Sequence, residues 1–94
     1  MGLLIQTNGH MKTIAPAGEA WTLEELQRCV EGYIERVPTP PGHSIVVDRQ
    51  PYREAWVNEE GILRDMPENI VASEALAYPV VGPCLLCSPA ERID

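Results

Sequence analysis

Residues 21–32, with the sequence WTLEELQRCVEG, are the stretch that best predicts the fold. Thr22 lies just before a helical pattern, and Glu25 lies three residues after Thr22. This spacing is the arrangement of a capping box. In a capping box the threonine hydroxyl accepts a hydrogen bond from the glutamate amide, and the glutamate carboxylate accepts one from the threonine amide. The stretch therefore predicts a helix that begins directly after Thr22.

The apolar side chains of this helix occur at helical spacing and form one stripe of Leu23, Leu26 and Val30. Trp21, just before the cap, is placed to pack on Leu26 as a hydrophobic staple. Gly32 is suited to end the helix, because glycine adopts the left-handed conformation without strain. A helix with a single apolar stripe needs a second apolar surface to cover it.

Short runs of strand-forming residues on both sides of the helix predict that surface. They occupy residues 3–6, 11–15, 33–37, 44–48, 52–58 and 80–87. Asn8-Gly9 predicts a tight turn between the first two runs. A turn at Pro40-Pro41-Gly42 separates the third run from the fourth, and we expect the fourth and fifth to pair as a hairpin. Pro83 predicts that the last strand is bent or lies at an edge of the sheet.

A second helix is expected over residues 70–77, because Asn69 can cap it and Pro79 follows it. We expect Ile62, Leu63 and Met66 to enter the core just before this helix. These elements together predict an α+β fold. The expected architecture is a single domain, residues 1–94, with a small mixed or antiparallel sheet of about five or six strands and two helices packed on it.

The charge and composition exclude several kinds of partner. The 94 residues include 14 acidic and seven basic side chains, which gives a net charge of −7. Nucleic acids and anionic membranes require clustered lysine and arginine, so neither is an expected partner. No apolar run approaches a membrane span or a secretory signal, and the three cysteines are an odd number. We therefore expect a cytoplasmic protein with free thiols.

Cys84 and Cys87 form a CxxC pair, but the residues between them are leucines and the setting is a predicted strand. Side chains three apart on a strand point to opposite faces, which favours buried structural thiols. A metal site would have to recruit Cys29, His10 and His43, and a redox pair is the other alternative. No arrangement of Ser or Asp near His10 or His43 implies a catalytic triad. The sequence thus predicts no catalytic residue, metal site or cofactor.

Three groups of residues are candidates for binding. Arg49, Tyr52 and Arg53 are close in sequence and can bind a phosphate or a stacked base, with a solvated hairpin tip as the favoured alternative. Trp21 and Trp56 are candidate partner contacts, with core anchoring as the alternative. The polar turn Asn58-Glu59-Glu60 is a further candidate partner contact, and its alternative is a turn whose glutamates simply face water.

Several motifs together resemble a known family. They are Leu23, Glu25, Leu26, Gln27 and Val30, then GYIE at 32–35, VNEEGIL at 57–63, Pro67, Asn69 and Ala72, and VVG at 80–82. This pattern resembles the family called domain of unknown function 3846. The resemblance implies a small protein carried by phages, plasmids and their hosts, and it implies no catalytic residues. The chain departs from the family pattern at Glu31, at Pro83 and in an insertion around 49–53.

These observations lead to two functional expectations. The first is a non-enzymatic accessory protein of a phage or mobile element that binds a host protein and forms a homo-oligomer. The alternative is a protein that binds or sequesters a small nucleotide signal, with Arg49, Tyr52 and Arg53 in its pocket.

Overall fold

The structure is a computed structural model that describes residues 2–38, 42–88 and 92–93. The turn expected at Pro40-Pro41-Gly42 lies largely outside these residues. The elements are β1 (Gly2–Ile5), β2 (Met11–Ile14), β3 (Ala20–Trp21), α1 (Leu23–Val30), β4 (Ile34–Arg36), β5 (Ile45–Val47), β6 (Gln50–Tyr52), β7 (Glu54–Asn58), α2 (Ile70–Leu76), β8 (Cys84–Cys87) and β9 (Arg92–Ile93).

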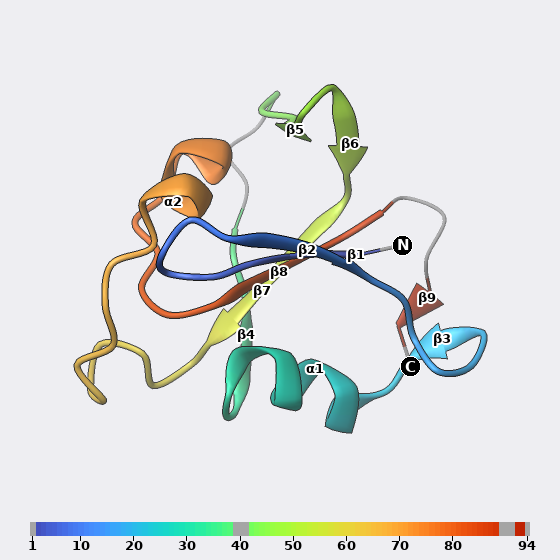
Figure 1. Cartoon of the computed structure of the whole chain (residues 1–94), viewed down its shortest axis with the longest axis horizontal. Helices are drawn as coiled ribbons and strands as arrows, with labels where there is room; N and C mark the ends of the chain where they lie inside the picture. The colour runs from blue at the N-terminus through green and yellow to red at the C-terminus, as the bar shows by residue number, and fades with distance from the viewer. Residues whose placement is uncertain (1, 39–41, 89–91, 94) are drawn as a thin grey trace.

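The main sheet has five strands in the order β2-β1-β8-β7-β4, and every neighbouring pair is antiparallel (Figure 1). Two smaller pairs accompany it, a parallel β3–β9 pair and an antiparallel β5–β6 hairpin. The architecture is the predicted α+β fold with two helices. The β1–β2 hairpin closes as the Asn8-Gly9 pattern predicted, since the Gln6 amide donates to the His10 carbonyl at 2.8 Å.

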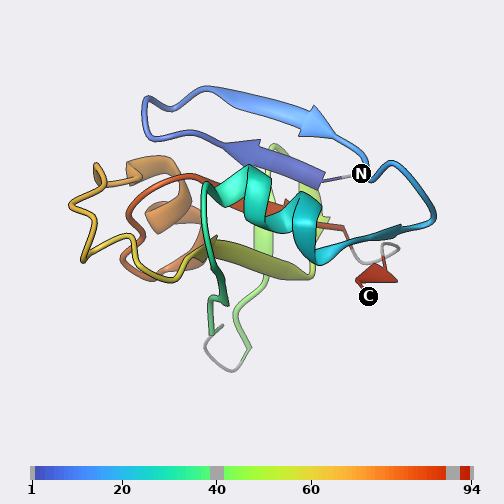
Figure 2. The ribbon, with the colours of Figure 1, turned by 90° about the horizontal axis from the view of Figure 1, so that it is seen from below.

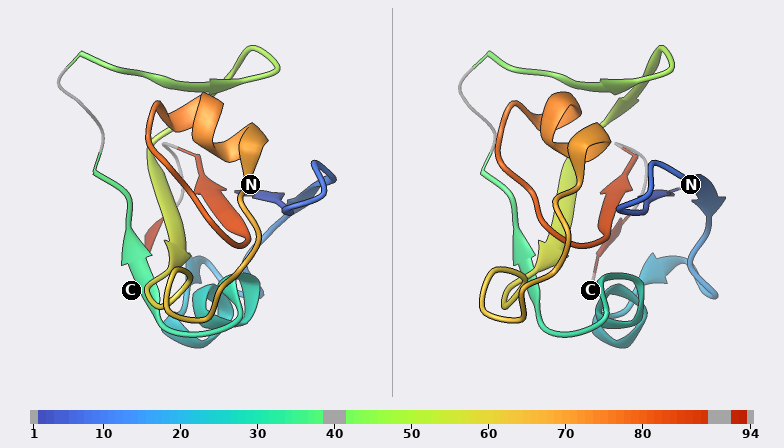
Figure 3. Two further views of the ribbon diagram at one scale, coloured as in Figure 1. Left: turned by 90° about the vertical axis from the view of Figure 1, so that its left-hand side faces the viewer. Right: turned by 60° about the vertical axis from the view of Figure 1, so that its left-hand side comes forward.

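The two faces of the sheet carry separate cores. α1 covers one face, where Trp21, Leu26, Leu85 and Cys87 are buried. α2 and the β5–β6 hairpin cover the other face, where the buried side chains are Leu3, Ile5, Val37, Ile45, Ala55, Val57, Ala72, Leu76, Val80, Cys84 and Leu86. Figure 2 shows α1 lying across the strands, and Figure 3 shows α1 and α2 on opposite sides of β7 and β8. Both helices therefore contribute to burying a single sheet.

The last long strand was predicted to be bent or at an edge of the sheet, and its central position excludes the edge. β8 lies between β1 and β7, and its four residues are all buried. Pro83 precedes β8, so its missing N–H removes no hydrogen bond from the ladder. The missing donor is confined to the proline itself, and here that position is the strand entrance.

The expected hairpin of 44–48 with 52–58 is also corrected. Residues 50–52 form β6 and pair with β5, whereas residues 54–58 form β7 and join the main sheet. The chain changes partner at Arg53, whose amide donates to the carbonyl of Cys87 at 2.7 Å. Pro51 is tolerated because it sits in a two-stranded hairpin outside the main sheet.

Two smaller expectations at loops are wrong. Ile62 and Leu63 do not enter the core, because their side chains are 83% and 84% exposed. The left-handed residue at the end of α1 is Glu31, with φ of 65°, rather than Gly32.

Candidate functional site

A shallow groove of about 90 Å³ lies where the end of β7 meets two loops. Its lining residues are Glu35, Val57, Asn58, Glu59, Gly61, Ile62, Tyr78, Pro79, Val80 and Val81. They come from β4, from β7 and the loop that follows it, and from the segment between α2 and β8. The groove thus joins three parts of the chain that are far apart in sequence.

Asn58 holds one wall of the groove in place. Its Nδ2 donates to the carbonyl of Val30 at 3.0 Å, and its Oδ1 accepts from the amide of Glu60 at 2.8 Å. The first bond satisfies a carbonyl at the end of α1, and the second shapes the loop as an Asx turn. Arg64 adds a second bond to the helix end, from Nη1 to the carbonyl of Glu31 at 2.6 Å.

Gly61 lets this loop lie directly against the opposite wall. A Cβ at Gly61 would lie 2.8 Å from Cγ2 of Val81, which is too close for two carbon atoms. The amide of Gly61 donates to the carbonyl of Asn58 at 3.2 Å, so the turn is closed as well as packed. The absence of a side chain at this position is therefore needed for the groove to form.

Asn69 fixes the segment that supplies the other wall. This fully buried side chain donates to the carbonyls of Ile5 and Gly82 at 3.0 and 2.9 Å and accepts from the amide of Ala72 at 3.1 Å. The backbone amide of Asn69 donates to the carbonyl of Val80 at 2.8 Å. One amide side chain thus ties β1, the start of α2 and the approach to β8 together.

The rim of the groove is apolar and acidic. Ile62 is largely exposed there, followed in the chain by the equally exposed Leu63. Tyr78 lies on the opposite side and is also exposed. The carboxylates of Glu35 and Glu59 are exposed and make no hydrogen bond or ion pair with the residues that the structure describes. Exposed apolar side chains rimmed by charge are typical of surfaces that bind proteins.

The structure separates the predicted partner contacts into two sets. Trp21 is 1% exposed and Asn58 is 4% exposed, so both are core residues and neither can serve as a surface contact as predicted. Trp56 is partly buried beneath α1. Glu59 is exposed and Glu60 half-buried, and only Glu59 of this set lines the groove as a surface residue.

The predicted ligand residues do not share a cavity. Arg49 is exposed in the β5–β6 turn, with φ of 67°. Tyr52 lines a hollow of about 300 Å³ between that hairpin and β1–β2, whereas Arg53 lines another hollow of about 230 Å³. The structure instead places Arg53 beside Arg36, a residue that sequence reasoning did not single out.

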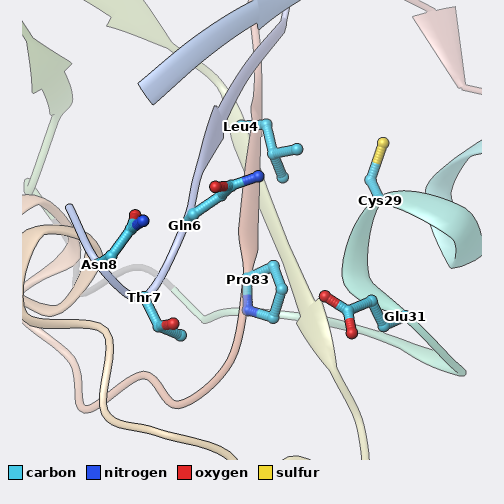
Figure 4. Close-up of a pocket in the computed structure, with 7 residues that line it drawn as sticks. All are labelled: Leu4, Gln6, Thr7, Asn8, Cys29, Glu31 and Pro83. Carbon is cyan, nitrogen blue, oxygen red and sulfur yellow. The ribbon is translucent and has the colours of Figure 1, made fainter. Parts of the chain in front are cut away.

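A polar hollow of about 250 Å³ lies between the β1–β2 turn and the end of α1 (Figure 4). Its lining residues are Leu4, Gln6, Thr7, Asn8, Cys29, Glu31 and Pro83. Partial burial, and the charge of Glu25, raise the pKa of the Cys29 thiol. Because a thiol with a raised pKa is a poor nucleophile at neutral pH, the hollow can offer hydrogen bonds but no activated cysteine.

The CxxC pair is split between the two cores, as predicted. Cys84 packs on the α2 side and Cys87 on the α1 side of the sheet. Burial, with a smaller contribution from Cys87, raises the pKa of the Cys84 thiol to about 12. Within residues 2–38, 42–88 and 92–93, no three His, Cys, Asp or Glu side chains gather as metal ligands do.

The sequence pattern did not identify Glu35 or Ile62 as surface contacts. A signal for Ile62 and Leu63 was nonetheless present, because this apolar pair is flanked by Glu59-Glu60-Gly61 and by Arg64-Asp65. A two-residue apolar run between charged residues has no helical or strand period that would point it inward.

Comparison with known proteins identifies the family of this chain. Among the described residues, no helix has both the length and the apolar character needed to span a membrane. Searches of curated proteins and of solved structures each gave no match. The family model called domain of unknown function (DUF3846) matches residues 2–94. Because this match covers nearly the whole sequence, the chain belongs to the DUF3846 family.

Proposed function

We propose that this protein is a non-enzymatic accessory protein of a phage or other mobile element and that it acts by binding a host protein. The observation that carries the proposal is that Ile62, which lines the groove, and Leu63, the next residue in the chain, are both more than four-fifths exposed, while buried asparagines fix the walls of the groove. Two large aliphatic side chains that stay exposed contribute almost no hydrophobic free energy to folding, and a partner that covers them gains that free energy on binding.

The charge of the rim selects the kind of partner. Glu35 and Glu59 bring two carboxylates to a groove on a chain whose net charge is already −7. A second copy would bring the same carboxylates and be repelled, whereas a segment with lysine or arginine beside an apolar residue would be attracted. The partner segment is therefore basic and apolar, and the proposed homo-oligomer uses another surface and leaves the groove open.

Capture of host proteins by matched variants tests this function. The immobilised wild-type chain, an Ile62→Ser/Leu63→Ser variant and a Leu23→Ser control are incubated with host lysate, and bound proteins are quantified by mass spectrometry. Leu23 is a matched control because it is exposed on α1 and does not line the groove. We expect proteins that bind wild type and the control but are about tenfold reduced on the double variant.

Two further measurements complete the test. Binding should weaken as salt is raised, because the rim charges are exposed to solvent. A basic apolar peptide from the captured protein should also bind the isolated chain and lose affinity with Glu59→Gln. Proteins that bind all three immobilised chains equally, or none above background, would refute the proposal. Mass measurement in solution separately tests the homo-oligomer.

The small-ligand alternative was predicted to use Arg49, Tyr52 and Arg53, and only Arg53 lines a hollow together with another arginine. Arg53 and Arg36 line one hollow, whereas Arg49 and Tyr52 lie elsewhere. A nucleotide signal would have to be recognised at this arginine pair rather than at the predicted trio.

A further inference from the structure

The hollow of about 230 Å³ at the end of the β4–β7 pair is lined by Arg36, Val37, Pro38, Arg53 and Glu54. Arg36 ends the edge strand β4, and Arg53 lies at the junction of β6 and β7. The groove at the end of β7, which contains Ile62 and is proposed to bind a host protein, is called the docking groove below. The hollow shares no lining residue with the docking groove. It is therefore a separate feature of the surface.

The backbone around the two arginines is fixed by the sheet. The amide of Arg53 donates to the carbonyl of Cys87 at 2.7 Å, and the amide of Val37 donates to the carbonyl of Ala55 at 2.9 Å. Arg36 is paired in register with Trp56 on β7. The Cα positions of the two arginines are thus set by hydrogen-bonded strands, so the guanidinium groups need only adjust their side-chain torsions to meet a ligand.

Both guanidinium groups are available for a ligand. Arg36 and Arg53 are exposed, and neither guanidinium group forms a hydrogen bond or ion pair with the residues that the structure describes. Only seven basic side chains occur in the chain, and two of them face this one hollow. Glu54 brings one negative charge to the same hollow, which leaves an excess of one positive charge.

We propose that Arg36 and Arg53 form a binding site for the phosphate group of a small ligand. Guanidinium groups present parallel N–H donors that match phosphate oxygens, and two of them can hold one phosphate from two sides. A phosphate carries up to two negative charges near neutral pH, so two arginines neutralise it while Glu54 opposes it. The site goes beyond the docking function and gives the small-ligand alternative a defined place.

Titration with three probes tests the site and separates the sources of the phosphate. Inorganic phosphate, adenosine monophosphate and adenosine are each added to the full chain and followed by calorimetry and by the Arg Nε–H signals in nitrogen–proton NMR spectra. We expect saturable binding of the two phosphate-bearing probes and none of adenosine. Tighter binding of the nucleotide than of inorganic phosphate would assign the site to phosphate esters, and equal binding would assign it to free phosphate.

Four exposed or partly exposed positions supply the variants. Arg36→Gln and Arg53→Gln should each weaken phosphate binding about tenfold, whereas Glu54→Gln should tighten it a few-fold because the opposing charge is removed. Arg49→Gln is the matched control, since it loses the same charge in a turn outside the hollow. The NMR spectra of each variant show whether its fold is retained.

The outcomes are distinct from those of the docking experiment. No saturable binding, or equal weakening by Arg49→Gln and Arg53→Gln, would overturn the phosphate site and leave the docking groove unaffected. Retained phosphate binding in the Ile62→Ser/Leu63→Ser variant, with loss in Arg36→Gln, would establish that the two sites are independent.

Discussion

The free backbone groups at the two ends of helix α1 find their hydrogen-bond partners in different ways, from nearby residues at one end and from distant residues at the other. At the beginning, Thr22 accepts from the amide of Glu25 at 3.2 Å, and the Glu25 carboxylate accepts from the amide of Thr22 at 3.0 Å, both near the surface. At the end, the carbonyls of Val30 and Glu31 accept from Asn58 and Arg64, which are 28 and 33 residues further along the chain. One end is closed locally, and the other is closed by the loop that forms the docking groove.

This difference explains why the polar Asn58 is buried while the apolar Ile62 and Leu63 are exposed in the same loop. A buried carbonyl without a donor is costly, so the position next to the helix end requires a polar side chain. The rest of the loop then follows from the turn that Asn58 makes, and its tip is directed into solvent. Backbone hydrogen bonding, more than side-chain polarity, decides which residues of this loop are inside.

Replacing Asn58 should have the largest effect on stability among changes at the helix ends. In Asn58→Ala the carbonyl of Val30 and the amide of Glu60 both lose their partner, so the free energy of unfolding should fall by about 2–3 kcal/mol. Urea unfolding followed by tryptophan fluorescence measures the change.

Two further variants sharpen this result. Asn58→Asp keeps the acceptor for Glu60 but cannot donate to Val30, so it should also be strongly destabilised. Arg64→Gln removes an exposed donor from the same helix end and should lower the stability much less. A loss in Asn58→Ala no greater than that in Arg64→Gln would show that the distant closure of α1 contributes little.

A change at the beginning of α1, where the cap is local, should lower the free energy of unfolding by less than Asn58→Ala does. Thr22→Ala removes the hydroxyl that caps α1, and the expected loss is about 1 kcal/mol, as for other N-cap threonines. Thr22→Ser, which keeps the hydroxyl, should stay near wild type in the same urea measurement. If Thr22→Ala destabilised the protein more than Asn58→Ala, the contrast between the two ends would be reversed.

The smallest expected effect depends on pH and concerns Glu25. Hydrogen bonds from the amides of Ala17 and Thr22 lower the pKa of this carboxyl below its ordinary value of 4.5. Since the folded pKa is lower than the unfolded pKa, the stabilisation is present above pH 4.5 and is lost as the pH falls through the folded pKa.

Glu25→Gln should therefore be less stable than wild type at neutral pH, and the two should converge in acid. Unfolding midpoints measured across this range test the point, and Glu24→Gln is the neighbouring control on the same helix turn. A gap between wild type and Glu25→Gln that does not narrow on acidification would contradict the assigned role.

The sequence predicted the elements whose contacts are short in range. The β1–β2 hairpin, the capping box and the Asn69 cap of α2 each form as expected, because their partners lie within a few residues. It did not place β8, which was predicted to be bent or at an edge on account of Pro83, because a proline at the strand entrance and one within the strand cannot be distinguished from composition.

The candidate sites were predicted only in part. Glu59 lines the groove at the end of β7, and Arg53 lines the hollow at the end of the β4–β7 pair, as parts of the predicted sets, but their neighbours there are Tyr78 and Arg36. These pairings join segments 19 or 17 residues apart, counted as 78 minus 59 and 53 minus 36. No periodic pattern in the sequence encodes which loops will meet across a sheet.

The sequence by itself determined the capped start of α1, the first hairpin and the separation of Cys84 from Cys87 onto opposite faces. Each follows from local hydrogen bonding or from the two-residue period of a strand. Only the tertiary structure decided that β8 is central, that Asn58 is buried and that Ile62 and Leu63 are exposed. Those outcomes depend on which distant backbone groups need a partner once the sheet has formed.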